Sequence, residues 1–485
     1  MQINFREYDW VKFFRDYGLV PRAKRQKRNK NGKGKKTGSE VVNVFAAFDI
    51  ETSLIRLSDV NTDAHSFMYI WQFQIEDNLI IGRTWEEWFE LLAYLKAALE
   101  VVGSEWKLDD PPMLITWIHN AAYEFSYISG LYDFTDEECF FRDVRKPIYF
   151  RMYGAFEFRC SYIQSNLSLA ALTKQTGVKL KLSGQKYDYS KVRFPWTQLT
   201  DFELEYCTTD VEALVAAMKY RVHRGGDTLL TVPLTSTGYV RRECKASLKD
   251  RYLQINEMKP YKGENGVRVY RLLRACFRGG NTHANRYHVG KICKDVYSYD
   301  IASSYPTQQL THKFPMKPFK WLDNDLSLER IFLFIGLDYA VVGEYHFTNL
   351  RLKNPKEPIP YISLSRCEAM GFTVDNGRIL KAEYLEISLT EIDLKIILDT
   401  YTYEKLEVIA CMVAPKDYLP EEYRAVIQDY YEKKTRLKGD DTEDGKYMYM
   451  KSKNMLNSVY LRNECYGSDT SGNLIQRRRL YQVRI

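Results

Sequence analysis

The sequence predicts a multidomain chain of mixed α/β and α+β type. Its 485 residues are enough for two or three domains with separate cores. From Val41 to about Leu234, runs rich in β-branched and aromatic residues alternate with helical stretches at 85–99 and 200–220, which is typical of an α/β domain. A turn-rich run at 233–238 then predicts a domain boundary.

Composition places the chain among ordinary globular proteins, with 45% hydrophobic and 27% charged residues. No apolar run reaches the roughly 18 residues that span a membrane, and the first residues lack the apolar core of a signal peptide. We therefore expect a cytoplasmic protein with no membrane partner. The nine cysteines show no CxxC pair, which favours reduced structural thiols. A net charge of +7 suits a polyanion partner, although many proteins with that charge have none.

The first forty residues are expected to contain a short helix and a flexible basic arm. The helix is predicted within residues 5–14, and the arm is the lysine- and arginine-rich run from Arg22 to Lys36. Like charges at this density repel one another and leave nothing apolar to bury. Two interpretations remain open, a solvated linker and a segment that binds phosphates without sequence preference.

A second α/β region is expected from Lys291 onward, after a helical stretch that ends near Cys276 and a turn at Gly279-Gly280. A predicted strand at 296–298 would place Asp300 at a strand end. Further along, the pattern predicts two strands and three helices, at 385–389, 407–411, 392–399, 421–436 and 446–461.

Carboxylates recur at three places in the first α/β region. Asp49 and Glu51 lie two residues apart at a strand end, so both project to one side. Tyr206 and Asp210 lie four apart on a predicted helix and share a face. With Glu124, they offer the three or four carboxylates that two divalent metals need to hydrolyse a phosphodiester. Taken alone, the Asp49–Glu51 pair is weak evidence, because charged pairs at strand ends are common and are usually only solvated.

The order of these elements resembles the three exonuclease motifs of the DnaQ-like 3′→5′ proofreading domain, which has an RNase H-like fold. The resemblance implies two Mg²⁺ or Mn²⁺ ions per active centre, with Tyr206 orienting the attacking water. The implied metal ligands are Asp49, Glu51, Glu124 and Asp210. Thr52, Asn120 and Tyr123 would hold the 3′ end of a single strand. The family usually has Asp at the position of Glu124, and its phosphate-contacting lysine would be either Lys181 or Lys186.

Three segments downstream resemble the active-site core of family B DNA polymerases, most closely the protein-primed type of phages, organelles and viruses. They are Phe277-Arg278-Gly279-Gly280, the run Tyr299 to Pro306, and the helix from Lys453 to Tyr460. The resemblance implies a partial polymerase palm followed by a two-helix fingers element. Asp300 would bind metal, and Tyr305 would be the steric gate beneath the sugar.

The same resemblance implies further contacts to nucleotide and DNA. Nucleotide contacts are expected from Ile301, Tyr305, Lys438, Lys453, Asn457 and Tyr460. DNA contacts are expected from Phe277, Arg278, Gly279, Gly280, Ser303 and Ser458. A plain loop, a surface lysine and an ordinary amphipathic helix are the alternatives for these segments. The family usually has Gly where Leu461 stands, and residues 306–423 resemble its priming-protein-binding insertion.

The resemblance also sets the expected domain boundaries. These are an N-terminal helix and arm (1–40), the exonuclease domain (41–235), a connecting region (236–290), the palm with its insertion (291–417), the fingers (418–462) and a C-terminal segment (463–485). The third polymerase motif, Tyr-x-Asp-Thr-Asp-Ser, has no equivalent here, because Tyr466 to Thr470 is interpreted as a loop. We therefore expect a truncated, split or degenerate polymerase.

The leading hypothesis is a proofreading exonuclease fused to an incomplete DNA polymerase. One alternative is a stand-alone 3′→5′ exonuclease whose polymerase part only grips DNA. Another is a non-catalytic scaffold that binds DNA or a priming protein. The expected partners are primer-template and single-stranded DNA, dNTPs, a terminal priming protein and a separate chain that carries the missing motif.

Overall fold

The computed structural model describes residues 2–21, 39–56, 64–143, 145–177, 187–248, 264–284, 287–323, 326–354 and 360–464. The chain forms two compact units. The first contains residues 1–239 and 433–454, and the second contains residues 240–432 and 455–485. None of the described helices is long and apolar enough to cross a membrane. The cysteines within the described ranges are free thiols.

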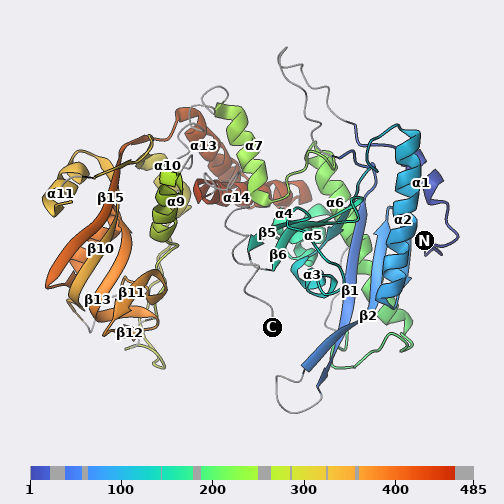
Figure 1. The fold of residues 1–485 in the computed structure, drawn as a ribbon, viewed down its shortest axis with the longest axis horizontal. Helices are drawn as coiled ribbons and strands as arrows, with labels where there is room; N and C mark the ends of the chain where they lie inside the picture. Colours follow the sequence, from blue (N-terminus) through green and yellow to red (C-terminus); the bar gives the residue numbers. More distant parts are fainter. Residues whose placement is uncertain are drawn as a thin grey trace. The chain divides into compact units, whose positions relative to one another are not determined.

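A mixed sheet of seven strands forms the centre of the first unit (Figure 1). In chain order they are β1 (Ala46–Arg56), β2 (Ala64–Ile75), β3 (Asn78–Gly82), β4 (Leu114–Ile118), β5 (Cys139–Asp143), β6 (Lys146–Met152) and β7 (Phe156–Cys160). Their order across the sheet is β3-β2-β1-β4-β7-β6-β5. β4 pairs in parallel with both β1 and β7, whereas the other neighbours are antiparallel.

Helices cover both faces of this sheet. α1 (Trp10–Tyr17) and α2 (Trp85–Glu105) pack on one face, and α5 (Leu169–Thr176) and α6 (Asp201–Arg224) pack on the other. α2 and α6 both begin with a capping box, at Thr84 and Thr200, in which a glutamate three residues on caps the N-cap backbone in return. The helices predicted at 85–99 and 200–220 are thus confirmed, each with a longer C-terminal end.

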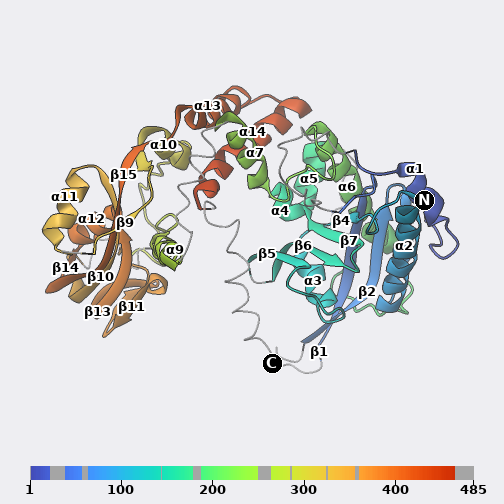
Figure 2. The same ribbon diagram turned by 45° about the horizontal axis from the view of Figure 1, so that its top comes forward.

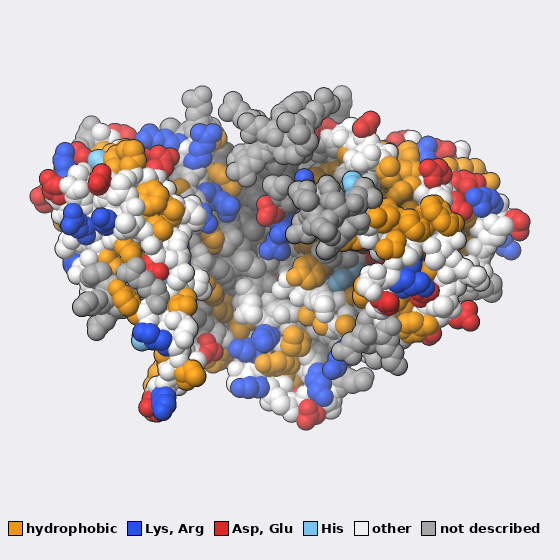
Figure 3. Space-filling view, turned by 90° about the horizontal axis from the view of Figure 1, so that it is seen from below, with side chains coloured by type: hydrophobic (Ala, Val, Ile, Leu, Met, Phe, Trp, Pro, Cys, Tyr) orange, Lys and Arg blue, Asp and Glu red, His pale blue; other side chains and the backbone are white. Residues whose placement is uncertain are grey.

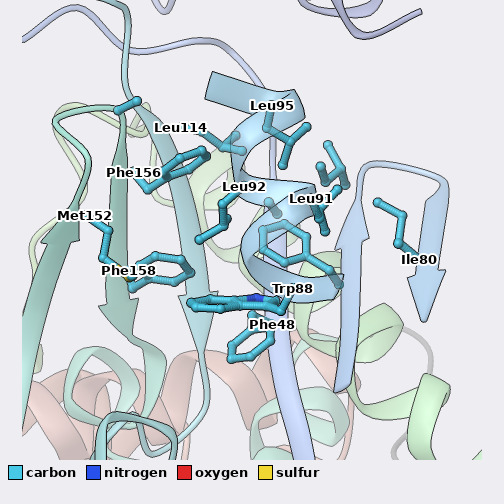
Figure 4. Close-up of a cluster of buried hydrophobic side chains, with 14 of the residues drawn as sticks. Phe48, Ile80, Trp88, Leu91, Leu92, Leu95, Leu114, Met152, Phe156 and Phe158 are labelled. Atoms are coloured by element: carbon cyan, nitrogen blue, oxygen red, sulfur yellow. The ribbon is translucent and has the colours of Figure 1, made fainter. Parts of the chain in front are cut away.

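The alternation of side chains along β1 sorts them between the two cores. Phe48 and Ile50 point into the core beneath α2, where Phe48 packs against Trp88 and near Phe158 (Figure 4). Ala47 belongs to the opposite core, beneath α6. Burial of the Phe48 and Ile50 side chains stabilises the fold by about 1.5–3 kcal/mol each. The strand that carries Asp49 and Glu51 is therefore fixed in register from both sides.

Three more helices are found in or directly after this part of the chain. They are α3 (Ala122–Ile128), α4 (Ser161–Ser165) and α7 (Ser236–Leu248). α3 comes four residues after β4, and α4 directly follows β7. The short N-terminal helix α1 begins five residues later than the start of the predicted stretch 5–14.

An antiparallel sheet forms the centre of the second unit (Figure 2). Its strands are β8 (Lys313–Pro315), β9 (Lys320–Trp321), β10 (Tyr339–Leu352), β11 (Cys367–Met370), β12 (Thr373–Asp375), β13 (Arg378–Thr390), β14 (Tyr401–Thr402) and β15 (Lys405–Tyr418). The main order is β11-β13-β10-β15-β8; β12 pairs with β13, β14 with β10 and β9 with β15. The strands predicted at 385–389 and 407–411 lie within β13 and β15, so both are confirmed.

Six helices belong to the described part of the chain from residue 264 onward, and three of them pack on this second sheet. Their bounds are α9 (Glu264–Cys276), α10 (Ser304–Thr311), α11 (Leu328–Gly336), α12 (Glu391–Thr400), α13 (Glu421–Arg436) and α14 (Glu443–Glu464), with a 3₁₀ turn at Leu364–Arg366. α9 packs against β10 and β13, α11 against β10, and α12 against β13. The three helices predicted at 392–399, 421–436 and 446–461 correspond to α12, α13 and α14.

The strand predicted at 296–298 is wrong. Residues 291–301 are neither helix nor strand, and within the described ranges no strand pairs with them. Val296 and Tyr297 are 73% and 77% exposed. A run of β-forming residues becomes a strand only when a neighbour accepts and donates its backbone hydrogen bonds, and this run has no such neighbour in the described part.

Candidate functional site

β1 places two carboxylates on the sheet face beneath α6. Asp49 and Glu51 alternate with Phe48 and Ile50, which point into the opposite core. The β1–β2 ladder shifts register between Glu51 and Thr52. Bulges of this kind re-aim side chains and are over-represented beside active sites. The strand therefore presents both carboxylates on one face of the sheet, directly before this shift in register.

α6 brings the third carboxylate to the same place. Tyr206 and Asp210 are one helical turn apart, and only 2% and 5% of their surfaces are exposed. The helix packs directly against β1. One carboxylate oxygen from each of Asp49, Glu51 and Asp210 can lie within 4.8 Å of the others. Within the described residues, these three side chains form the group whose positions suit a shared metal ion.

Glu124 is the fourth carboxylate, and the chain turns sharply to place it. β4 ends at Ile118, beside β1, and Asn120 then adopts a left-handed backbone with φ of 64°, a conformation that asparagine tolerates better than most residues. α3 starts at Ala122, so Glu124 lies in its first turn with 2% of its surface exposed.

Burial makes ionisation of Glu124 unfavourable. Desolvation raises the pKa of its carboxyl well above the usual range, and the nearby Asp49 carboxylate raises it further by repulsion. Its Oε2 atom is buried and has no hydrogen-bond partner among the described residues. A cation between these carboxylates would relieve both the repulsion and the unsatisfied oxygen. The residues therefore fit a divalent metal.

These groups line one pocket of about 190 Å³. Its walls are formed by Asp49, Ile50, Glu51, His119, Tyr123, Glu124, Leu169, Tyr189, Tyr206, Asp210 and Leu214. Oxygen ligands dominate its floor, which is the donor chemistry that Mg²⁺ and Mn²⁺ prefer. The four predicted carboxylates and the predicted phenol of Tyr206 thus share a single enclosure.

Two tyrosines that the sequence analysis did not single out complete the phenol side of the pocket. Tyr189 Oη lies 2.6 Å from Tyr206 Oη, and the ring of Tyr187 stacks on Tyr206 at 4.4 Å. Tyr187 is held in turn by a hydroxyl contact to Tyr69. Burial and the hydrogen bond with Tyr189 raise the pKa of Tyr206, so its phenol remains protonated. The Tyr-x-Tyr pattern at 187–189 is visible in the sequence. It does not predict a contact with Tyr206, because its distance in sequence from the carboxylates follows no rule.

The residues predicted to hold single-stranded DNA gather around Tyr123, which lines the pocket. Thr52 Oγ1 and Tyr123 Oη are 2.5 Å apart, which joins β1 to α3. Tyr123 is 43% exposed, and Asn120 is also exposed. Of the remaining predictions for this region, Lys181, Lys186 and the basic arm from Arg22 to Lys36 lie outside the described residues.

In the second unit, Phe277 to Gly280 follow the end of α9. The guanidinium of Arg278 donates to the backbone oxygen of Ser388 at 3.0 Å and lies 3.4 Å from Asp393, so the protein itself engages the charge expected to face DNA. Gly279 and Gly280 are exposed. A β-carbon on Gly280 would lie 3.7 Å from Tyr305 Oη, which brings this turn close to the predicted steric gate.

Asp300 and its neighbours are open to solvent. Asp300 is exposed, Ile301 is 67% exposed and Tyr305 is 43% exposed. Ser303, which caps α10, has a left-handed backbone with φ of 52°, a strained conformation that often marks functional turns. No group of three metal-ligating side chains within the described ranges includes Asp300.

The predicted phosphate and base contacts near the C-terminal end lie on α14 and in the turn before it. Lys453 and Asn457 are both exposed on α14, four residues apart and therefore on one face. Lys438 is exposed in the turn that joins α13 to α14. Ser458 and Tyr460 also belong to α14, but their side chains lie outside the described part of the structure.

Comparison with known proteins adds two findings. Residues 156–462, more than half of the chain, match the sequence model of a family described as DNA polymerase type B, organellar and viral. The sequence matches no curated protein.

Solved structures of phi29 DNA polymerase share the fold. One holds primer-template DNA and another holds single-stranded DNA; each aligns with a TM-score of 0.60 at 14% identity and covers 87% of this chain and 68% of the other. An orthorhombic crystal form aligns with a TM-score of 0.58 at 16% identity, covering 86% and 67%.

Proposed function

We propose that this chain, which belongs to the organellar and viral type B DNA polymerases, carries a metal-dependent 3′→5′ exonuclease in its first unit. One observation supports this most strongly. Asp49, Glu51 and Asp210 converge within 4.8 Å, with the buried Glu124 and Tyr206 in the same pocket. Among the described residues that line the pocket, the carboxylates gather around one space together with His119.

Each residue has a distinct task in the proposed reaction. The four carboxylates would hold the metals, and Asp49 and Glu51 lie on the same face because they come from one strand. Two bound divalent ions would activate the attacking water and neutralise the leaving oxygen. Tyr206, kept protonated by burial and by Tyr189, holds that water in line by hydrogen bonding. Glu124 is one methylene longer than the aspartate usual at this position, which leaves ligation possible from its place on α3.

Single-stranded DNA is the proposed substrate. One of the similar structures is phi29 DNA polymerase complexed with single-stranded DNA. The proposed contacts to the sugar and base are Thr52, Asn120 and Tyr123: Tyr123 lines the pocket with a 43% exposed ring, and Thr52 and Asn120 both contact Tyr123. The proposed lysine ligand of the scissile phosphate is Lys181 or Lys186.

For the part of the chain from residue 264 to residue 464 we propose the nucleotide-handling part of a DNA polymerase. Phi29 DNA polymerase with primer-template DNA and incoming nucleotides is among the similar structures. The proposed ligand of the catalytic metal is Asp300. Tyr305, Ile301, Lys438, Lys453, Asn457 and Tyr460 would contact the nucleotide, and Phe277, Arg278, Gly279, Gly280, Ser303 and Ser458 the DNA.

These 485 residues by themselves are proposed not to extend a primer. Nucleotide transfer needs two metals held by more than one carboxylate, whereas Asp300 is solvent-exposed and belongs to no carboxylate cluster within the described ranges. We propose two partners: a separate chain that carries a second metal-binding aspartate, and a terminal priming protein. Exonuclease activity alone and DNA binding alone remain the competing functions.

The direct test of the exonuclease is digestion of a 5′-labelled single strand by the purified chain. We expect a ladder that shortens from the 3′ end with Mg²⁺ or Mn²⁺ and is absent with EDTA. Asp49→Ala combined with Glu51→Ala should abolish it, because two of the metal ligands are lost. The matched control is Asp109→Ala with Asp110→Ala, which removes two exposed charges of the same unit. Undiminished digestion by the first double variant would refute the assignment.

A further inference from the structure

Three aromatic rings form a stack beside the proposed catalytic pocket. Phe67 on β2 lies parallel to Phe194, with ring centroids 5.4 Å apart and an interplanar angle of 16°. Phe194 in turn stacks on Trp196 at 4.9 Å and 4°. Trp196 is 79% exposed. Patches of exposed hydrophobic side chains are visible on the molecular surface (Figure 3), but a parallel stack that ends in an exposed indole is a specific geometry.

The stack lines an open hollow of about 500 Å³. Ile55, Met68, Trp85 and Leu131 add aliphatic and aromatic surface to the three rings. An exposed tryptophan next to a hollow of this size leaves apolar surface in water, which is unfavourable unless something covers it. A flat aromatic ligand would extend the stack and fill the hollow.

The loop that carries Phe194 and Trp196 is held firmly. Arg83 donates to the backbone oxygens of Phe194 and Thr197 at 3.0 and 2.9 Å. The backbone N–H of Phe194 donates to Thr197 Oγ1 at 2.8 Å. Just before the stack, Arg193 forms a buried ion pair with Glu203 at 2.7 Å. The rings are therefore positioned before any ligand arrives, which lowers the entropic cost of binding.

The hollow adjoins the catalytic pocket through α3. Tyr123 lines the pocket and Tyr127, one turn later, lines the hollow, and their rings contact edge to face with centroids 5.6 Å apart. Tyr127 is fixed by a hydroxyl contact to Ser66 on β2. A strand whose 3′ end lies at the carboxylates can thus continue past Tyr123 and Tyr127 to the ring stack.

We propose that Trp196, supported by Phe194 and Phe67, is a stacking platform for a base of single-stranded DNA upstream of the 3′ terminus. The inference rests on the proposed exonuclease, because the strand must enter the adjoining pocket. Stacking on an aromatic ring does not depend on base identity, since every base has a flat face. The platform would hold any sequence while the terminal nucleotide is removed, and its loss would weaken binding about 5- to 100-fold.

The test uses the intact chain in EDTA, so that no digestion occurs, with oligonucleotides of increasing length that carry 2-aminopurine at successive positions. We expect one interior position to be quenched by stacking. Trp196→Ala should abolish that quenching and raise the Kd at least about fivefold for the longer oligonucleotides. Trp196→Phe should keep most of both effects, because the ring is retained. Trp196 is exposed, so its replacement should not disturb folding.

Val192→Ala is the control, because Val192 is 40% exposed in the same loop and outside the stack. An equal Kd for Trp196→Ala and the control at every length would overturn the platform. The platform would also be overturned if Trp196→Ala changed the self-association of the protein and left its Kd for DNA unchanged. The same experiments distinguish failure of the proposed exonuclease from failure of the platform. If the chain does not digest DNA with metal but Trp196→Ala still weakens binding of the longer oligonucleotides, the exonuclease proposal is refuted and the platform is supported.

Discussion

The two carboxylate sites of this chain differ in how they are supported. Asp49, Glu51, Glu124 and Asp210 come from β1, α3 and α6, which pack around one sheet and its two cores. Asp300 comes from a segment that has neither a helix nor a strand to hold it. The first group lines a pocket, whereas Asp300 is exposed to solvent.

The contrast shows what fixes the position of a carboxylate. Burying like charges together is unfavourable, and the first unit sustains it because β1 is anchored on both sides by Phe48, Ile50 and Ala47. Around Asp300 no such core exists within the described residues, and the neighbouring Tyr299 and Ile301 are 91% and 67% exposed. The resemblance in sequence predicts a metal site at both places. The packing around the carboxylates differs between them, and this difference cannot be read from the motifs.

The largest expected change in stability comes from a substitution that weakens the packing behind the first site. Glu203 forms a buried ion pair with Arg193, whose guanidinium lies 4.6 Å from the ring of Tyr187. Glu203→Gln should lower the free energy of unfolding by about 3 kcal/mol at neutral pH, because it leaves a buried charge with a weaker partner. Denaturant unfolding followed by tryptophan fluorescence measures it.

The effect should depend on pH in a definite direction. Burial opposes ionisation of Glu203, but hydrogen bonds from the Thr200 backbone, Lys191 and Arg193 outweigh it and lower the pKa from 4.5 to about 2. The stabilisation by the carboxylate is complete above the unfolded pKa and is lost as pH falls through the folded pKa. The difference between wild type and Glu203→Gln should therefore shrink between about pH 4.5 and pH 2. A difference that grows on acidification would contradict this assignment.

A smaller effect is expected from Tyr206→Phe. The variant keeps the ring that stacks on Tyr187 but loses the hydroxyl beside Tyr189. We expect digestion of single strands to slow by about 10- to 100-fold, as for other groups that orient a metal-bound reactant. The Kd for Mn²⁺, measured by calorimetry, should stay unchanged because no metal ligand is altered. An equal loss of metal affinity would mean that the phenol supports the carboxylates and does not orient the water.

Much of the first site could be predicted because its spacing is local. Asp49 and Glu51 share a strand face by alternation, and Tyr206 and Asp210 share a helix face by the four-residue step. Tyr189 and Tyr187 were missed because their contacts to Tyr206 are set by how a loop folds back on α6. The ring stack of Phe67, Phe194 and Trp196 joins residues more than a hundred positions apart, which no local rule reveals.

The failed strand prediction at 296–298 has a different cause. β-propensity describes how well a residue suits a paired strand, and it cannot supply the partner. β13 and β15 were predicted correctly by the same criterion because β10 lies between them and pairs with both. The family resemblance identified the polymerase type, which the match over residues 156–462 confirms.

The contrast between the two sites is tested most directly on a 5′-labelled primer annealed to a longer template, with Mg²⁺ and all four dNTPs. The wild-type chain should shorten the primer. The Asp49→Ala, Glu51→Ala double variant removes digestion, so that even slow extension would accumulate. We predict that this variant leaves the primer at its original length, because Asp300 alone cannot hold two metals. Primers longer than the input, lost again on adding Asp300→Ala, would show that the second site is complete in this chain and would contradict the account.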